Sequence, residues 1–224
     1  AHTSASTALV AAGEVDTSFL HAIASGDYDL LSGHVWTPEP RLIGSWRASI
    51  LRRWLEDISS DRIDHNCRLS VVAAWPAQHH GDPSLMDHSR LAAEQARETP
   101  GQEEMRPYID FLSVSLGADG VEASAELAAG CLEQMSNSDP WRAGVCFHRG
   151  AALFLLGRAQ EALEEMERGR ALAHAFEYPL VEALTLATMF LAQHRREDRL
   201  HAHSTFGELC ALADHSDAGD DAAP

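Results

Sequence analysis

Apolar residues recur at helical spacing along almost the whole chain. In the segment 41–58, RLIGSWRASILRRWLEDI, the apolar positions follow one another at steps of three and four, which places them on one face of an α-helix. No stretch of alternating apolar and polar residues competes with this pattern. The sequence therefore predicts an all-α fold.

Start and stop signals divide this pattern into separate helices. Asp82-Pro83 and Asp139-Pro140 each offer an N-cap carboxylate followed by proline at the first helical position, where the missing N–H costs nothing. Gly81, Gly117 and Gly157 each follow an apolar helical run, where a left-handed residue is favoured. We therefore expect helices to begin and end at these positions.

The signals recur at a nearly fixed interval, with helix pairs starting roughly 36 to 38 residues apart. The third pair carries small residues where a tetratricopeptide (TPR) repeat places them for close contact of its two helices, at Gly150, Gly157, Ala162 and Gly169. Stacked pairs of this kind bury one continuous core and leave a concave surface. The sequence thus predicts a TPR-like superhelix of antiparallel helix pairs, an α-solenoid, with pairs at 66–80 and 83–97, 102–116 and 120–135, 140–156 and 158–174, and 178–194 and 197–213.

The predicted organisation has three parts. An introductory helical layer covers 1–64, with helices at 15–25, 28–36 and 41–58, and the four TPR-like pairs fill 65–213. The remainder, 214–224, is acidic and is expected to be a flexible tail. Pro76 lies inside the first paired helix, and because proline removes a backbone hydrogen bond we expect that helix to be distorted or to stop early.

The charge balance narrows the range of partners. The chain carries 34 acidic side chains against 17 basic ones, all of them Arg, for a formal net charge of −17. Binding of phosphate backbones relies on cationic contacts, so we expect no direct nucleic-acid binding. The absence of Lys also removes the P-loop and Schiff-base chemistry.

Membrane and disulfide chemistry are not expected either. No run reaches the ~18 to 20 apolar residues of a membrane span, and the first residues lack the basic region of a signal peptide, so we expect a cytoplasmic chain without membrane contact. The Cys residues form no CxxC pair, which argues against a disulfide framework and a zinc ribbon. We interpret all four as buried thiols, namely Cys67, Cys131, Cys146 and Cys210.

Thirteen His residues make metal binding a hypothesis to weigh. His79 with His80, and His201 with His203, do not share a helix face, and no HExxH, GxSxG or Cys/His signature is present. We therefore expect no metal, no cofactor and no catalysis. A His-dependent metal-binding enzyme is the alternative, which elemental analysis would identify.

Two stretches resemble a known family. They are 51–56 (LRRWLE) with 68–69, 73–75 and 81–82, and 139–143 (DPWRA) with 150–158 (GAALFLLGR) and 161–163. Together they resemble the helical-repeat region of MalT-type, ATP-dependent LuxR-family bacterial transcriptional regulators, over about 15–213. The resemblance implies a region that senses inducers or partner proteins and controls assembly of the regulator. The chain contains neither the nucleotide-binding module nor the DNA-reading helices of that family, and Pro76 departs from its apolar helix.

The concave groove is the predicted site. In repeat solenoids the first helix of each pair lines the inner face, which indicates an apolar trough formed by Phe147, Ala151, Phe154, Trp75, Phe111 and Leu184. The competing interpretation is that these side chains belong to the core. The expected function is a non-enzymatic sensor module that binds a small-molecule inducer or a partner protein in this groove, and a homo-oligomer is compatible with it. The other alternative is a stand-alone TPR scaffolding adaptor.

Overall fold

The computed structural model describes residues 4–6, 8, 15–36, 48–64, 66–80, 103–117 and 119–220. These residues form helices and the turns between them, and no strand occurs within these ranges. The chain divides into two compact units, one made of Ala1–Ile43 with Arg47–Leu112 and the other of Gly44–Trp46 with Ser113–Pro224. The prediction of an all-α fold is therefore confirmed for the described part of the chain.

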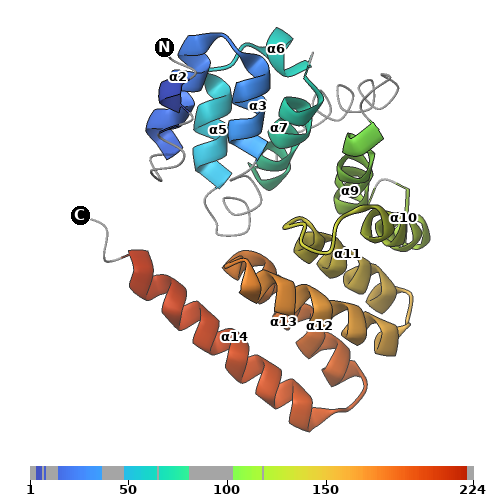
Figure 1. The fold of residues 1–224 in the computed structure, drawn as a ribbon. Helices are drawn as coiled ribbons and strands as arrows, with labels where there is room; N and C mark the ends of the chain where they lie inside the picture. The colour runs from blue at the N-terminus through green and yellow to red at the C-terminus, as the bar shows by residue number, and fades with distance from the viewer. Residues whose placement is uncertain are drawn as a thin grey trace. The chain divides into compact units, whose positions relative to one another are not determined.

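The first unit is organised around one helix, α7 (Cys67–His80), which contacts α3, α5 and α6 (Figure 1). Its core is closed by large apolar side chains that are almost fully buried, such as Phe19, Leu31 and Leu69. The Phe19 ring stacks on Trp54 with 4.7 Å between ring centroids. The other elements of this unit are α2 (Val15–Ser25), α3 (Tyr28–Trp36), α5 (Ala48–Glu56), α6 (Ser60–Asp64), the short helix η1 (Glu103–Met105) and most of α9 (Arg106–Leu116).

The second unit is a series of consecutive antiparallel helices, in which each helix packs on the next (Figure 1). The α11 helix contacts not only α12 but also α13, so the helices stack in layers instead of forming separate hairpins. One core cluster, centred on Met166 and Leu153, joins side chains of four of these helices. The helices are α10 (Val121–Gln134), α11 (Arg142–Leu155), α12 (Ala159–Ala175), α13 (Pro179–Arg195) and α14 (Arg199–Asp220).

The tightest helix contact lies between α11 and α12, at two of the small residues that the sequence singled out. A Cβ added at Gly150 would lie 2.6 Å from Cγ of Met166, and one added at Gly169 would lie 3.0 Å from Cβ of Cys146. Ala162, with no exposed surface, belongs to the same interface. Small side chains at these positions are therefore what allows the two helices to approach so closely.

The turns after α11, α12 and α13 share one backbone arrangement. Gly157, Glu177 and Glu197 each adopt positive φ, at 79°, 59° and 61° respectively. In each turn the next residue donates its N–H to a carbonyl five residues back, which is the 6→1 bond of a Schellman motif. These bonds are Arg158 N to Leu153 O at 2.9 Å, Tyr178 N to Ala173 O at 2.8 Å, and Asp198 N to Gln193 O at 3.0 Å.

Two of the predicted helix ends are confirmed, one predicted N-cap is wrong, and the others lie outside the described residues. Gly117 and Gly157 have the expected positive φ, at 61° and 79°. The N-cap predicted at Asp139 is wrong, because α11 begins at Arg142 and the Asp139 carboxylate instead accepts a hydrogen bond from the Trp141 backbone N–H at 2.9 Å within the preceding turn. Gly81, Asp82-Pro83 and the predicted helix 83–97 lie outside the described residues.

Two helices run further than the sequence suggested. The α7 helix passes through Pro76 to His80, so the predicted early stop is wrong. Proline removes only the hydrogen bond to the carbonyl of Val72, and the buried residues 67 and 69–75 hold the helix in place. The α14 helix continues to Asp220, into the predicted tail at 214–224, and it passes through both Gly207 and Gly219.

Candidate functional site

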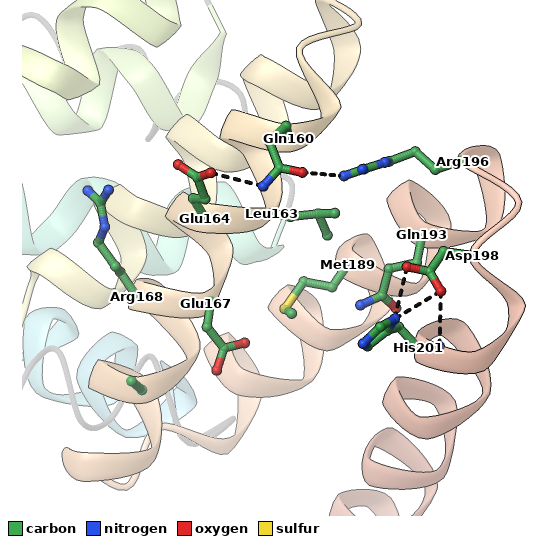
Figure 2. A pocket seen from close by; sticks show the side chains of 11 residues that line it. Gln160, Leu163, Glu164, Glu167, Arg168, Met189, Gln193, Arg196, Asp198 and His201 are labelled. Carbon is green, nitrogen blue, oxygen red and sulfur yellow. Dashed lines mark hydrogen bonds and ion pairs between the residues drawn. The ribbon is translucent and has the colours of Figure 1, made fainter.

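The second unit has an open groove of about 730 Å³ on α12, α13 and the start of α14. This volume lies within the range of ligand sites in proteins, about 300–1,000 Å³. Figure 2 shows its side chains approaching one another from α12 on one side and from the turn between α13 and α14 on the other. We call it the α12–α14 groove, lined by Gln160, Leu163, Glu164, Glu167, Arg168, Ala171, Met189, Gln193, Arg196, Asp198 and His201.

The apolar part of the groove comes from Leu163 on α12 and Met189 on α13. Met189 is 7% exposed and belongs to the core cluster around Met166, and Leu163 packs against that cluster. These two side chains are therefore held by the core beneath them and form a fixed apolar surface.

The α12 side of the groove carries an ordered polar chain. Arg196 donates from Nη1 to Oε1 of Gln160 at 2.6 Å, and Gln160 donates from Nε2 to Oε1 of Glu164 at 2.9 Å (Figure 2). Arg196 follows the last residue of α13, so these two hydrogen bonds connect the end of α13 to the beginning of α12.

The opposite side is formed by the first turn of α14. Nδ1 of His201 lies 2.9 Å from each carboxylate oxygen of Asp198, and the His201 backbone N–H donates to Oδ1 of Asp198 at 3.4 Å. The side-chain hydrogen bond with His201 is the main cause that lowers the pKa of the Asp198 carboxyl below its usual value. Asp198 therefore stays ionised and holds the imidazole ring at the edge of the groove.

Gln193 supplies an acceptor that nothing else in the described structure uses. Its side chain reaches from α13 into the groove (Figure 2), only 7% of the residue is exposed, and its Oε1 has no hydrogen-bond partner among the described residues. A buried carbonyl oxygen without a partner costs about 1–3 kcal/mol, so this position favours a ligand or water that donates a hydrogen bond. The groove combines this acceptor with the exposed guanidinium of Arg168, whose side chain is 65% exposed.

Metal binding has no matching arrangement in this part of the chain. Within the ranges that the structure describes, no group of three or more His, Cys, Asp or Glu side chains is placed to hold a metal ion. His201 meets a single carboxylate, that of Asp198. The side chains of His79 and His80 lie outside the described residues.

The six residues predicted for the concave groove fall into three places. Trp75 and Phe111 are 5% and 2% exposed and lie 4.9 Å apart, ring to ring, inside the first unit. They contact each other there, as the competing core interpretation proposed.

The other four predicted residues belong to the second unit. Phe147, Ala151 and Phe154 share a face of α11 and are half-buried, with Phe154 packed on the core cluster and 5.7 Å below the guanidinium of Arg195. Leu184 on α13 is 41% exposed. None of the six lines the α12–α14 groove.

Sequence reasoning missed the polar residues of the groove. Gln160 and Arg196 are 36 residues apart, which is the spacing of the predicted helix pairs. Complementary polar side chains at the predicted spacing of the helix pairs were therefore a usable signal, because consecutively packed helices bring such residues close together.

The thiols are not reactive groups of this groove. Burial, with a further contribution from the nearby Glu165 carboxylate, raises the pKa of Cys146 to about 12, and burial raises that of Cys67 to about 11. Cys131 is buried as well. The interpretation of all four as buried is wrong for Cys210, which is exposed on α14.

Comparison with known proteins returned no relative. No protein-family model, no curated protein and no solved structure matches this chain. Among the helices of the described ranges, none has the length and apolar character needed to cross a membrane.

Proposed function

We propose that this chain is a non-enzymatic regulatory module that binds a small inducer or a short segment of a partner protein in the α12–α14 groove. The observation that carries the proposal is the buried Oε1 of Gln193, which has no partner among the described residues and belongs to a side chain that lines the groove beside the hydrogen-bonded Gln160 and His201. Binding costs less when the receiving groups are held in place beforehand, and here Gln160 and His201 are held by hydrogen bonds inside the chain. The ligand class is one that donates a hydrogen bond and brings an apolar part to Leu163 and Met189.

The proposal extends to the architecture, a TPR-like superhelix. Small residues at the α11–α12 contact, the repeated Schellman turns and the contact of α11 with α13 support it. Polar contacts at the repeat interval support it further. Arg170 on α12 donates to Glu208 on α14 at 3.2 Å across 38 residues, and in the first unit Arg68 donates to Glu104 at 2.9 Å across 36 residues.

The resemblance to MalT-type regulators suggests what binding would achieve. In that family the helical-repeat region senses inducers or partners and controls assembly. For this chain the corresponding mechanism is that a ligand binds one state of the regulator more tightly than the other and shifts the population toward it. The two alternatives remain a scaffolding adaptor, which binds without such a shift, and a His-dependent metal-binding enzyme.

Methyl NMR on the ¹³C-methionine-labelled chain tests the groove directly. The Met189 methyl group lies in the groove, and that of Met105 belongs to the first unit and serves as an internal control. A panel of metabolites and short peptides is titrated, and we expect at least one saturable shift of the Met189 signal with Met105 unchanged. A panel that leaves Met189 unmoved, or that moves both signals alike, contradicts the proposal.

A blocking variant with a matched control separates groove binding from other effects. Ala171 is an exposed groove residue of α12, so Ala171→Trp fills the groove without disturbing the core, and Ala24→Trp places the same ring on an exposed position of α2. We expect the first to abolish binding and the second to leave it unchanged. Loss of binding in Phe147→Ala but not in Ala171→Trp would instead assign the ligand to the α11 face predicted from the sequence.

A further inference from the structure

A second hollow lies between α13 and α14 and shares no residue with the α12–α14 groove. It has a volume of about 260 Å³, and we call it the α13–α14 notch, lined by Phe190, His194, Arg199, Ala202, His203 and Phe206. The rings of Phe190 and Phe206 lie 5.7 Å apart, and His194 stacks on Phe190 at 6.0 Å. Aromatic rings thus form its walls, and Phe206 keeps 49% of its surface exposed.

The apolar surface continues along both helices beyond the notch. Ala183, Ala187 and Phe190 follow one another at steps of four and three on α13, so they share one face of that helix. On α14 the exposed Cys210 and Ala213 continue the face of Phe206 in the same way. The small side chains leave room for another backbone to approach, and residues 199–213 of α14 offer roughly 22 Å of helix length. This is the shape that receives an amphipathic helix.

The segment that contributes to the rim of the notch carries a positive formal charge in an acidic chain. With His neutral, 194–203, HRREDRLHAH, holds three Arg against two acidic residues, in a chain whose formal net charge is −17, and Arg199 is the Arg that lines the notch. Arg199 and His203 are exposed at the notch, and neither forms an ion pair with another described residue. An apolar hollow with the guanidinium of Arg199 and the imidazole of His203 at its rim favours an occupant with carboxylates around an apolar anchor.

We propose that the α13–α14 notch and the adjoining faces of α13 and α14 bind an acidic amphipathic helix of a partner protein. An apolar side chain of that helix enters between Phe190 and Phe206, and its carboxylates meet Arg199 and His203. A basic helix would be repelled by the rim. A second copy of this chain is a different occupant, which the oligomeric state of the parent chain distinguishes from a partner helix. The proposal concerns a surface separate from the α12–α14 groove and does not depend on the function proposed for that groove.

Two synthetic peptides that differ only in charge test the proposal. Each is a fluorescein-labelled amphipathic helix of about 18 residues, roughly 27 Å long, with one Leu stripe and with Glu in one peptide and Lys in the other on the polar face. Fluorescence anisotropy with the full chain measures binding. We expect the Glu peptide to bind at least about tenfold more tightly than the Lys peptide, and its affinity to fall as salt is added.

Variants then locate the peptide on the chain. Phe206→Ala is expected to weaken the Glu peptide about tenfold, and Arg199→Glu with His203→Glu is expected to reverse the preference between the peptides. Circular dichroism checks that both variants keep the helix content of the parent, which we expect because Arg199, His203 and Phe206 are exposed. The matched controls are Phe147→Ala, an aromatic truncation elsewhere in the same unit, and Ala171→Trp, which blocks the α12–α14 groove, and both should bind the Glu peptide normally.

Three results would overturn the proposal. The first is equal binding of the two peptides, and the second is Glu-peptide binding that survives both the Phe206→Ala and the charge-reversal variants. The third is a dimer of the parent chain in sedimentation velocity that Phe206→Ala converts to a monomer, which would assign the notch to a second copy. The α12–α14 groove is tested with other probes and by Ala171→Trp. A negative result at the α13–α14 notch therefore does not contradict ligand binding in the groove, and a negative result in the groove does not contradict helix binding at the notch.

Discussion

Replacing Gly150 by Ala tests whether close contact between α11 and α12 holds the second unit together. The new methyl group would lie 2.6 Å from Cγ of Met166, well short of the 3.4 Å at which ordinary contacts begin. Met166 has no exposed surface, and its Cγ is near the α12 backbone, so it has little room to withdraw. The two helices must therefore separate or the Met166 side chain must leave its preferred rotamer.

Two effects of opposite sign decide the outcome. Replacing a glycine inside a helix by alanine stabilises the helix by about 1 kcal/mol, while forcing an extra carbon into a packed core costs about 1–3 kcal/mol. We expect Gly150→Ala to lower the free energy of unfolding by about 0–2 kcal/mol. The matched control is Gly207→Ala on α14, where an added Cβ meets nothing within 4 Å and only the gain of about 1 kcal/mol remains.

Urea unfolding followed by circular dichroism measures both variants against the parent. We expect the free energy of unfolding to be about 1–3 kcal/mol lower for Gly150→Ala than for Gly207→Ala. Comparing the two variants cancels the gain in helix propensity, because both replace a helical glycine by alanine. In thermal unfolding this corresponds to about 2–4 °C per kcal/mol for a chain of this size. Hydrogen exchange of residues 142–175 should show faster exchange in Gly150→Ala, which places the loss in the α11–α12 hairpin.

A second change in the same contact completes the test. Met166→Ala removes the side chain that the new methyl group meets, so adding Gly150→Ala to it should become stabilising, with a coupling of about 1–3 kcal/mol. Equal stabilisation by Gly150→Ala and Gly207→Ala, or the absence of coupling with Met166→Ala, would refute the close-contact explanation.

Further predictions concern the turns, the thiols and a buried ion pair. Glu197→Gly should raise the free energy of unfolding by up to about 1 kcal/mol, because glycine adopts the positive φ of 61° without steric cost, and urea unfolding that shows a loss would contradict this. Iodoacetamide at pH 8, read by mass spectrometry, should label the exposed Cys210 in the folded chain and Cys146 only after unfolding, because the pKa of Cys146 falls from about 12 to its ordinary value near 9 when the chain opens. For the same reason the free energy of unfolding should decrease as the pH rises between these two values, and labelling of folded Cys146 at the rate of Cys210 would disprove its burial. Arg149→Leu should destabilise the chain by up to about 3 kcal/mol, since it removes the closer of the two Arg partners of Glu165, a residue 2% exposed, and leaves the Arg168 contact at 3.4 Å; adding Glu165→Leu should recover stability in the same urea assay.

The sequence predicted the helices well because the signals for them are local. Apolar periodicity placed helices at 15–25 and 28–36 with the observed bounds, and glycine marked the turns at Gly117 and Gly157. The turns at Glu177 and Glu197 use the same left-handed conformation with a residue that rarely adopts it, so composition gave no sign of them. Their position is set instead by the length of the helices on either side and by the hydrogen bonds that close each turn.

The candidate site was harder to predict because it depends on how the helices stack. The groove was predicted from large apolar side chains on the first helix of each pair, but Trp75 and Phe111 are packed against each other in the first unit. The residues of the α12–α14 groove are polar, and each looks like ordinary helix surface when its own helix is considered alone. Only the contact of Gln160 with Arg196, from a different helix, turns two surface side chains into part of a site.

Two polar contacts join residues whose separation matches the predicted interval between helix pairs. Where helices pack consecutively, as in the second unit, a residue can meet one that lies about two helices further along the chain. The contacts of Gln160 with Arg196 and of Arg170 with Glu208, at separations of 36 and 38 residues, both follow this relation. A single charge reversal, Arg170→Glu, should therefore loosen α12 from α14, and adding Glu208→Arg should restore the contact. Hydrogen exchange at 199–213 that is unaffected by the first change would show that α14 is held by its apolar contacts alone.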